Sequence, residues 1–467
     1  MSTENLFESI EPATNLIAEP RNNFFLETKA LIKLFFPLLL SQITYAISLF
    51  AAILMVGHLG KDALAALALV SSIYSALCAF FYGIFVSISV LVSQNFGAKN
   101  DKNIQLIVSQ GFVLAVICSI PFIIIMWHVP FILSWTGQDP KAILLSIPYL
   151  HALSFSIFPW LIQVVMEQFL IGLSLTRLVF LISLIQVPAE ILVTYVFIFG
   201  KFGFPAFGIS GIGYGFTLIL LLAVILIAVF ITRLNVTKKY FIFSYLGRIN
   251  KQFLLRLFQL GVPIGATNLI EYLLFPTLVL LIGRFGADAL AAHQITRQYF
   301  DLAITIGLAL AQATVVRVGQ AVGSKNASAV QLSAYVSLIT GVSLMLIIAL
   351  LYSIFAKNLI AFDIDITQIQ NNHVIFLAKN LLIIVAIFQI FDCIRLIAMA
   401  SLRGMEDTKI PMYITLFIYW LIGLTLSYFL GFILDLEVVG VWYGMLAAMI
   451  IGSLVILFRL RLFLQKI

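Results

Sequence analysis

Residues 57–66 read GHLGKDALAA, and residues 283–292 read GRFGADALAA. The match continues without a gap from residues 37–100 onto residues 263–326, at a constant offset of 226 positions. Prolines, loop glycines and charges agree in register, which chance similarity between apolar segments rarely produces: Pro37 pairs with Pro263, Gly60 with Gly286, and Lys99 with Lys325. The chain is therefore predicted to contain an internal duplication, so that one structural unit is built twice.

The composition is that of a membrane protein. Hydrophobic residues make up 62% of the 467 and charged residues only 10%, whereas soluble domains carry about 25% charged residues; the mean hydropathy is +1.12. The apolar stretches are continuous rather than alternating, which favours helices over a membrane β-barrel. Twelve of them reach the ~20 residues that a spanning helix needs, at residues 30–57, 62–92, 104–127, 141–173, 178–199, 206–233, 253–283, 288–316, 328–356, 373–401, 410–433 and 437–458. The sequence thus predicts an all-α integral membrane protein, with twelve transmembrane helices in two pseudo-symmetric six-helix lobes.

The duplication and the spans together predict the domain boundaries. Six spans return the chain to the side on which it started, so both halves enter the bilayer from the same side as parallel repeats. Two similar bundles can rock against each other and expose one site to alternate sides. We expect a cytoplasmic N-terminal tail (1–29), an N-lobe (30–233), a cytoplasmic linker (234–251), a C-lobe (252–463) and a short C-terminal tail (464–467).

The net charge of +7 reflects membrane topology rather than a nucleic-acid partner. When loops are assigned to alternate sides, one side collects 19 of the 27 Lys and Arg residues, and five fall on the other side. Basic residues accumulate on the cytoplasmic side of membrane proteins. We therefore expect a multi-pass protein of the bacterial inner membrane with both termini and the linker in the cytoplasm.

The sequence does not favour an enzyme. It has no phosphate-binding glycine-rich loop with its Lys, no metal-ligand cluster and no nucleophile with a His partner. We expect no cofactor and no structural metal. Because no ATP motif is present, uphill transport would draw on an ion gradient. A channel is a further class, but scattered buried carboxylates suit alternating access better than a symmetric filter.

Several motifs resemble those of the multidrug and toxic compound extrusion family, most closely its NorM-type bacterial members. These are the repeated Gly-x-x-Gly-x-Asp-Ala-Leu-Ala-Ala, Gly200-Lys201-Phe202-Gly203, Ser401-Leu402-Arg403-Gly404 with Asp407 and Pro411, and Tyr419-Trp420. The resemblance covers nearly all of residues 30–463. It implies a V-shaped pair of lobes and a monomeric antiporter that exports cationic, often aromatic compounds in exchange for H⁺ or Na⁺. A lipid-linked oligosaccharide flippase of similar layout is the alternative.

Two carboxylates lie within the predicted spans of the second half of the sequence. Glu271 and Asp392 fall where NorM-type members keep cation-binding carboxylates, and a charge in mid-span costs roughly 2.5–3.5 kcal/mol. A buried carboxylate can exchange a proton or Na⁺ for a cationic drug, so these two residues are candidates for transient binding of H⁺ or Na⁺, and the basic Arg395 beside Asp392 favours H⁺. The other interpretation is a buried ion pair, of Asp392 with Arg395 or of Glu271 with Arg297 or Arg395.

Span 288–316 contributes a further set of polar candidates. Arg297 and Asp301 lie four residues apart and are predicted to form an i,i+4 pair, with a place in the transport route as the alternative. Gln294 and Tyr299 could line the same cleft.

The first half departs from the resemblance. Ala52 stands where NorM-type members usually carry an aspartate, and Gln186-Val187-Pro188-Ala189-Glu190 replaces their Asn-x-Pro-x-Asn. Our hypothesis is that Glu190, with Gln186, restores the missing negative charge; the alternative is that Glu190 only sits at the polar side of its span. Glu167 and Gln163, with Gln168, form another polar patch, and because it lies towards the cytoplasmic end of its span, an interfacial role is the alternative.

Prolines inside spans remove helix hydrogen bonds and mark places where helices bend. The candidates are Pro37, Pro188, Pro263 and Pro276.

Overall fold

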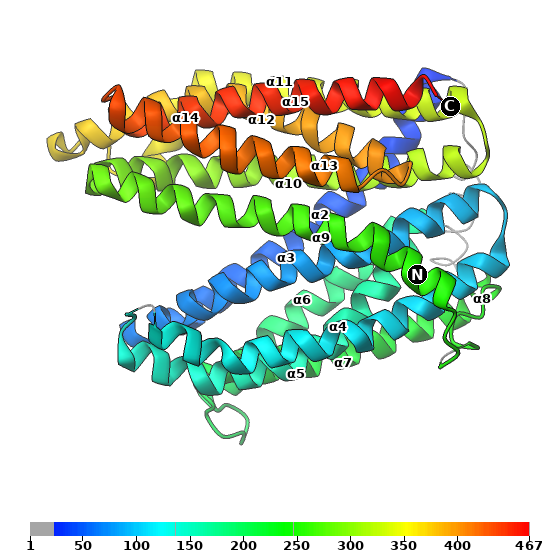
Figure 1. Ribbon diagram of the computed structural model, residues 1–467. Helices are drawn as coiled ribbons and strands as arrows, with labels where there is room; N and C mark the ends of the chain where they lie inside the picture. The colour runs from blue at the N-terminus through cyan, green and yellow to red at the C-terminus, as the bar shows by residue number, and fades with distance from the viewer. Residues whose placement is uncertain (1–22, 136, 246, 467) are drawn as a thin grey trace. The chain divides into compact units, whose positions relative to one another are not determined.

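The computed structural model describes residues 23–135, 137–245 and 247–466, and most of these residues lie in helices (Figure 1). Within this part of the chain, twelve helical segments are long and apolar enough to cross a membrane, and no strand occurs. The predicted all-α class and number of spans are confirmed. The spans are α2 (Phe24–Gly57), α3 (Lys61–Gly97), α4 (Asp101–Trp135), α5 (Pro140–Gly172), α6 (Thr176–Phe199), α7 (Ser210–Arg233), α9 (Lys251–Ile282), α10 (Ala287–Gly323), α11 (Ala327–Asp363), α12 (Asn372–Gly404), the composite segment Lys409–Ile433, and α15 (Glu437–Leu464).

The composite eleventh span is not a uniform α-helix. It contains two π-helical turns, which separate and follow two stretches of α-helix: α13 (Lys409–Leu416), a π segment (Phe417–Gly423), α14 (Leu424–Tyr428) and a second π segment (Phe429–Ile433). The remaining elements are short: α8 (Asn235–Lys238) and 3₁₀ turns at Gly283–Phe285 and Ile369–Asn371.

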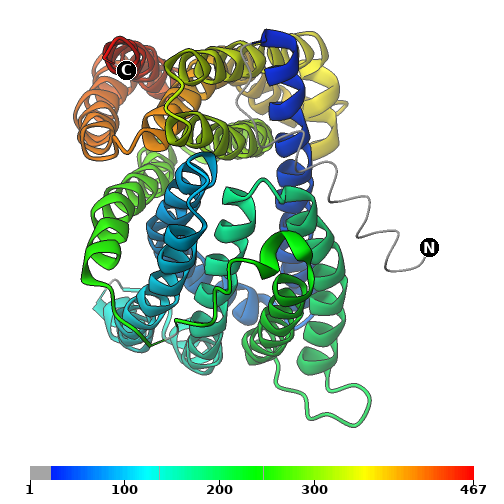
Figure 2. The same cartoon turned by 90° about the vertical axis from the view of Figure 1, so that its right-hand side faces the viewer.

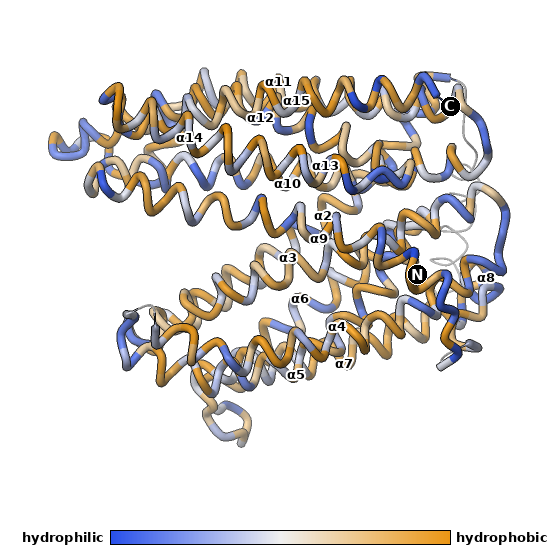
Figure 3. The backbone as a smooth tube through the Cα atoms, viewed as in Figure 1, coloured by the Kyte–Doolittle hydropathy of each residue, from blue (hydrophilic) through white to orange (hydrophobic). Residues whose placement is uncertain are grey.

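Many helices extend beyond the apolar stretches that predicted them. Helix α10, for example, continues to Gly323, although its apolar stretch ends at residue 316. Figure 3 shows that apolar residues dominate the helices and that hydrophilic residues gather at helix ends and loops. A hydropathy pattern ends at the hydrocarbon boundary, whereas the backbone hydrogen bonds of a helix continue until a cap stops them.

The duplication is reproduced in the backbone. Helices α3 and α10 both have 37 residues and begin after glycines with positive φ, 107° at Gly60 and 100° at Gly286. Both helices are followed by a lysine in the left-handed region, with φ of 55° at Lys99 and at Lys325. Only glycine adopts a φ near +100° without strain. This explains why a glycine stands at both Gly60 and Gly286.

The chain forms two compact units, each with a central helix. Unit 1 comprises Phe36–Gly265, and unit 2 comprises the described residues of Pro20–Phe35 and of Ala266–Ile467. In unit 1, α5 packs against α3, α4 and α7; in unit 2, α12 packs against α10, α11 and α15. These are the same partners in repeat order, the second, third and sixth spans of each half. The lobe boundaries predicted from the sequence remain a prediction.

Two helices belong to both units. Helix α2 begins in unit 2 and continues into unit 1 after Phe35, and α9 begins in unit 1 and continues into unit 2 after Gly265. In unit 1, the α9 glycines Gly261 and Gly265 lie directly against the backbone carbonyls of Ile84 and Phe80 on α3. Small residues four apart allow such close approach of two helices.

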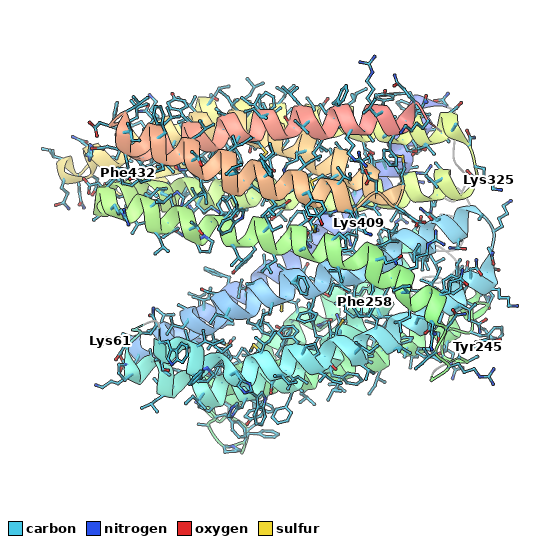
Figure 4. The ribbon with its side chains drawn as sticks, viewed as in Figure 1. Lys61, Tyr245, Phe258, Lys325, Lys409 and Phe432 are labelled. Carbon is cyan, nitrogen blue, oxygen red and sulfur yellow. The ribbon has the colours of Figure 1, made fainter. Side chains whose placement is uncertain are left out.

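The segment between α7 and α9 is fixed to unit 1. Gln110 on α4 donates to the carbonyl of Arg248 (2.8 Å) and accepts from the backbone N–H of Asn250 (3.0 Å). Ser109 donates to the carbonyl of Tyr245 (2.8 Å). In Figure 2 this segment crosses the helix ends of unit 1, and in Figure 4 Tyr245 lies at the end opposite to Lys61.

Candidate functional site

Three charged side chains meet inside unit 2. Arg395 on α12 donates through Nη1 to Oε1 of Glu271 on α9 (2.6 Å) and through Nη2 to Oδ1 of Asp392 (2.7 Å). The side chains of Arg395 and Asp392 are only 3% and 4% exposed, and that of Glu271 is 19% exposed. We call these residues the Arg395 cluster. Both candidate carboxylates thus pair with the guanidinium of Arg395. This is the arrangement that the ion-pair interpretation predicted for Arg395.

Helix geometry and burial explain how the cluster forms. Asp392 and Arg395 lie three residues apart, so they face the same side of α12, the central helix of unit 2. The Arg395 guanidinium lies 5.3 Å from the ring centroid of Tyr419. Burial of charge is tolerated only with close pairing. Because two carboxylates share one guanidinium, the three residues together carry a net charge of −1 when all are ionised.

A small pocket adjoins Asp392. It is lined by residues of α10, α11 and α12, among them Phe300, Met345, Gln389 and Cys393. The Gln389 side-chain oxygen is buried and has no hydrogen-bond partner within the described part of the chain. Buried polar oxygens are usually hydrogen-bonded, so the Gln389 oxygen stands out among the polar groups that line this pocket with Asp392.

Arg297 and Asp301 form the predicted pair on α10. Arg297 Nε donates to Asp301 Oδ1 (2.7 Å), and its guanidinium carbon lies 3.4 Å from the ring centroid of Phe275. Gln294, on the same helix, is exposed. Tyr299 is buried in the core of unit 2, where its hydroxyl donates to the carbonyl of Leu359 (2.8 Å).

Unit 1 contains a second polar cluster, which the sequence only partly predicted. Glu190 on α6 accepts from the Ser48 hydroxyl on α2 (2.6 Å). Gln163 on α5 donates to Glu167 (2.7 Å) and to Gln186 of α6 (2.8 Å). Tyr45 on α2 donates to Glu167 Oε1 (3.1 Å). We call the six residues the unit 1 acidic cluster: Tyr45, Ser48, Gln163, Glu167, Gln186 and Glu190.

Comparison with known proteins identifies the family. The sequence model of the MatE family matches residues 37–196 and 263–429. The chain belongs to the MatE family. A probable multidrug resistance protein NorM of Mesorhizobium japonicum is 31% identical over 442 residues, 94% of this chain and 95% of that protein. A probable multidrug resistance protein NorM of Synechocystis is 30% identical over 93% of this chain and 94% of its own length.

The fold of solved MATE transporters agrees with this assignment. A MATE structure in complex with MaL6 matches with a TM-score of 0.86 at 18% identity, covering 97% of this chain and 98% of that one. An outward-facing MATE family transporter of the MOP superfamily matches with a TM-score of 0.85 at 17% identity, with the same coverage. The family predicted from the motifs is confirmed, and this MatE chain is a multi-pass membrane protein.

The predicted bend prolines lie within the helices of this MatE chain. Pro37 is in α2, Pro188 is in α6 between Gln186 and Glu190, and Pro263 and Pro276 are in α9. Pro37 and Pro263, which match in the repeat, are both buried, whereas Pro188 and Pro276 are exposed. Bending at these residues stays a prediction.

Sequence reasoning missed Tyr45 and Ser48 as members of the unit 1 acidic cluster. A signal for them exists, because residues 45, 48 and 52 follow the i, i+3, i+7 spacing of one helix face. Ala52, where the aspartate is missing, is therefore on the same face as the two hydroxyls that meet Glu167 and Glu190. Glu27 lies within the predicted N-terminal tail (1–29), but the structure places it in α2 as a buried residue that pairs with Arg317.

Proposed function

We propose that this chain exports cationic organic compounds, often aromatic, from the cytoplasm in exchange for H⁺ or Na⁺. The observation that carries the proposal is the Arg395 cluster, in which Glu271 and Asp392 share a single buried guanidinium. The names of the NorM relatives as multidrug resistance proteins support the substrate class. Intramembrane ionisable residues mark substrate and ion pathways in transporters.

The charge of the cluster suggests how exchange works. Because the three residues sum to a charge of −1, one proton, one Na⁺ or one cationic substrate would neutralise the cluster. Binding of one cation removes the attraction for the next, because an excess positive charge in an apolar interior is costly. Export and ion entry then alternate at Glu271 and Asp392, while Arg395 keeps the two carboxylates in place.

Aromatic and polar neighbours on α9 and α10 supply the substrate contacts in this proposal. The Phe275 ring already holds the Arg297 guanidinium against its face, so a cationic aromatic substrate would take this contact by displacing Arg297. Gln294 and Asp301 are exposed and available for hydrogen bonds, and Arg297 would move with its partner Asp301. Tyr299 is given a supporting role, since its hydroxyl already donates to a backbone carbonyl.

The unit 1 acidic cluster is assigned as a second ionisable site. Glu190 and Gln186 replace the carboxylate that Ala52 cannot provide, and Ser48 donates to Glu190. Pro188 lies between these two residues and, with Pro37, Pro263 and Pro276, is proposed to bend its helix during the cycle. The cycle is proposed to run in a monomer of the bacterial inner membrane whose termini both face the cytoplasm.

The test is ethidium efflux from bacteria that lack their own exporters. Cells that express the wild-type chain should lose preloaded ethidium faster than cells with the empty vector. Glu271→Gln and Asp392→Asn should each abolish the difference at equal expression in the membrane. An unchanged rate in both variants would exclude the Arg395 cluster from transport.

The coupling ion is tested in the same cells. Efflux is compared with and without Na⁺ at a fixed pH gradient, and dissipation of the pH gradient with Na⁺ present is the complementary arm. A site for Na⁺ would need oxygen ligands from several groups, as hard cations do, and the lining of the pocket, within the described part of the chain, offers only Asp392 and the Gln389 oxygen among its polar side chains. A proton needs only the carboxylate. We favour H⁺, because the adjacent Arg395 competes with Na⁺ for Asp392.

The second candidate is a flippase for lipid-linked, negatively charged head groups. It is favoured by the two guanidinium groups that Arg297 and Arg395 place within their spans. Both groups are already paired with carboxylates, which argues for a cationic rather than an anionic cargo. Loss of cell-wall precursor export in a deletion strain, without any effect on ethidium, would support the flippase instead.

A further inference from the structure

A buried ion pair fixes the start of α2 within unit 2. Arg317 on α10 donates through Nε to Glu27 Oε1 (2.8 Å) and through Nη2 to Glu27 Oε2 (2.5 Å), so the contact is bidentate. The Ser333 hydroxyl of α11 donates to Glu27 Oε1 (2.8 Å), and Arg317 Nη1 donates to Gln320 (3.1 Å). Both charged side chains are only 1% exposed. The pair is therefore complete in its hydrogen bonds and closed to solvent.

Stability alone does not account for this pair. Desolvation of two ions offsets most of their attraction, so a well-packed apolar pair would serve as well or better. The internal repeat supports this point, because the counterpart of Arg317 at the offset of 226 is Leu91. A buried bidentate pair instead fixes how two helices lie relative to each other. The two parallel N–H donors of the guanidinium bind a carboxylate in a single orientation.

The helix that the pair fixes also reaches the unit 1 acidic cluster. Helix α2 runs unbroken from Phe24 to Gly57, and it changes from unit 2 to unit 1 after Phe35. Tyr45 and Ser48 on this helix donate to Glu167 and Glu190. Tyr45 follows Glu27 by about 27 Å along the helix, at about 1.5 Å per residue.

We propose that Glu27 and Arg317 are positioning residues for transport, which hold α2 so that the position of unit 2 sets the contacts of Tyr45 and Ser48 with the acids of unit 1. The inference rests on the proposed function, since it assigns the unit 1 acidic cluster a part in the cycle. Neither residue touches cargo or ion. The pair acts through α2, the helix common to both units.

The main test variant replaces both charges by neutral groups that can still hydrogen-bond, Glu27→Gln with Arg317→Gln. The matched control is Asp407→Asn with Arg459→Gln, which removes another largely buried ion pair of unit 2 that does not involve α2. Each protein is purified, and its melting temperature, its ethidium efflux in cells at equal expression and its amide hydrogen exchange are measured. Glu27→Asp, which keeps the charge but shortens the side chain, is the second variant if the neutral pair does not fold.

The expected result is that the neutral pair melts close to wild type but loses about five-fold in efflux, a typical effect of a residue that modulates coupling without touching ligand. Exchange should become faster in residues 45–57 of α2 as well as in residues 24–35. The control should leave the efflux rate and the amide hydrogen exchange of α2 as in wild type. Glu27→Asp should give smaller changes of the same kind.

Faster exchange confined to residues 24–35 would overturn the proposal, and so would efflux that falls only in proportion to the amount of folded protein in all variants. An equal loss in the Asp407 and Arg459 control would also overturn it, because the effect would not be specific to α2. If wild type itself does not export ethidium, the proposed function fails. The exchange comparison then still decides whether the pair positions Tyr45 and Ser48.

Discussion

Arg395 on α12 donates to Glu271 on α9 across 2.6 Å, although 124 positions separate them in the sequence. The same guanidinium holds Asp392, so one cation organises two acids from two helices. Such an arrangement is stable only as a whole, since the removal of any one partner changes the charge that the others must carry.

Arg395→Gln is expected to destabilise the protein by about 3–5 kcal/mol, because it removes the guanidinium with which both carboxylates form their ion pairs. The melting temperature of the purified protein in detergent, followed by size-exclusion chromatography, measures the effect. Arg395→Gln combined with Asp392→Asn should recover part of the loss, as only one carboxylate then remains. A melting temperature equal to wild type for Arg395→Gln would show that the cluster is not a coupled unit.

Glu190→Gln is expected to lower ethidium efflux and to weaken its dependence on external pH, because glutamine cannot take up a proton. Ser48→Ala, which removes the 2.6 Å donor to Glu190, should cause a smaller loss of the same kind. Efflux is measured over a range of pH at constant expression. Glu437→Gln, at an exposed acid at the start of α15, is the control. Activity and pH dependence equal to wild type in Glu190→Gln would end the hypothesis that Glu190 replaces the missing aspartate.

Gly261→Ala and Gly265→Ala are expected to destabilise unit 1, because the added methyl groups would meet the carbonyls of Ile84 and Phe80. Forced overpacking of this kind costs about 1–3 kcal/mol. Gly283→Ala is the matched control, since a methyl group there meets nothing within 4 Å. Thermal melting distinguishes the variants. Equal melting of Gly261→Ala and Gly283→Ala would mean that α9 shifts away from α3 at no cost.

Gln110→Ala is expected to release the segment between α7 and α9 from α4, because two hydrogen bonds of about 1 kcal/mol each are lost. Trypsin should then cleave faster at the basic residues of this segment, Lys238, Lys239, Arg248 and Lys251. Gln105→Ala removes one exposed hydrogen bond to Phe241 and is the comparison. Faster cleavage in both variants to the same degree would contradict the anchoring role of Gln110.

The fold was largely predictable because its information is local. Each span appears as its own apolar run, and Gly60 and Gly286, which match in the repeat, appear at turns with positive φ. The i,i+4 pair of Arg297 and Asp301 was predictable for the same reason, since helical spacing alone places the two side chains together.

The candidate site was predicted only as far as single residues. Glu271, Asp392 and Glu190 stand out because a charge in an apolar run needs an explanation. Their partners do not stand out in the same way. Ser48 is one hydroxyl among many on α2, and Arg395 could have paired with either acid or with both.

The sequence by itself determined the class of the protein, the number of its spans and its family, because hydropathy, spacing and motif order are written along one chain. Only the tertiary structure decided that Arg395 holds Glu271 and Asp392 together, and that Glu27 is a buried partner of Arg317 rather than part of a solvated tail. These contacts depend on which helix faces meet across 124 and 290 positions. Helix packing sets that choice, and no local pattern in the sequence records it.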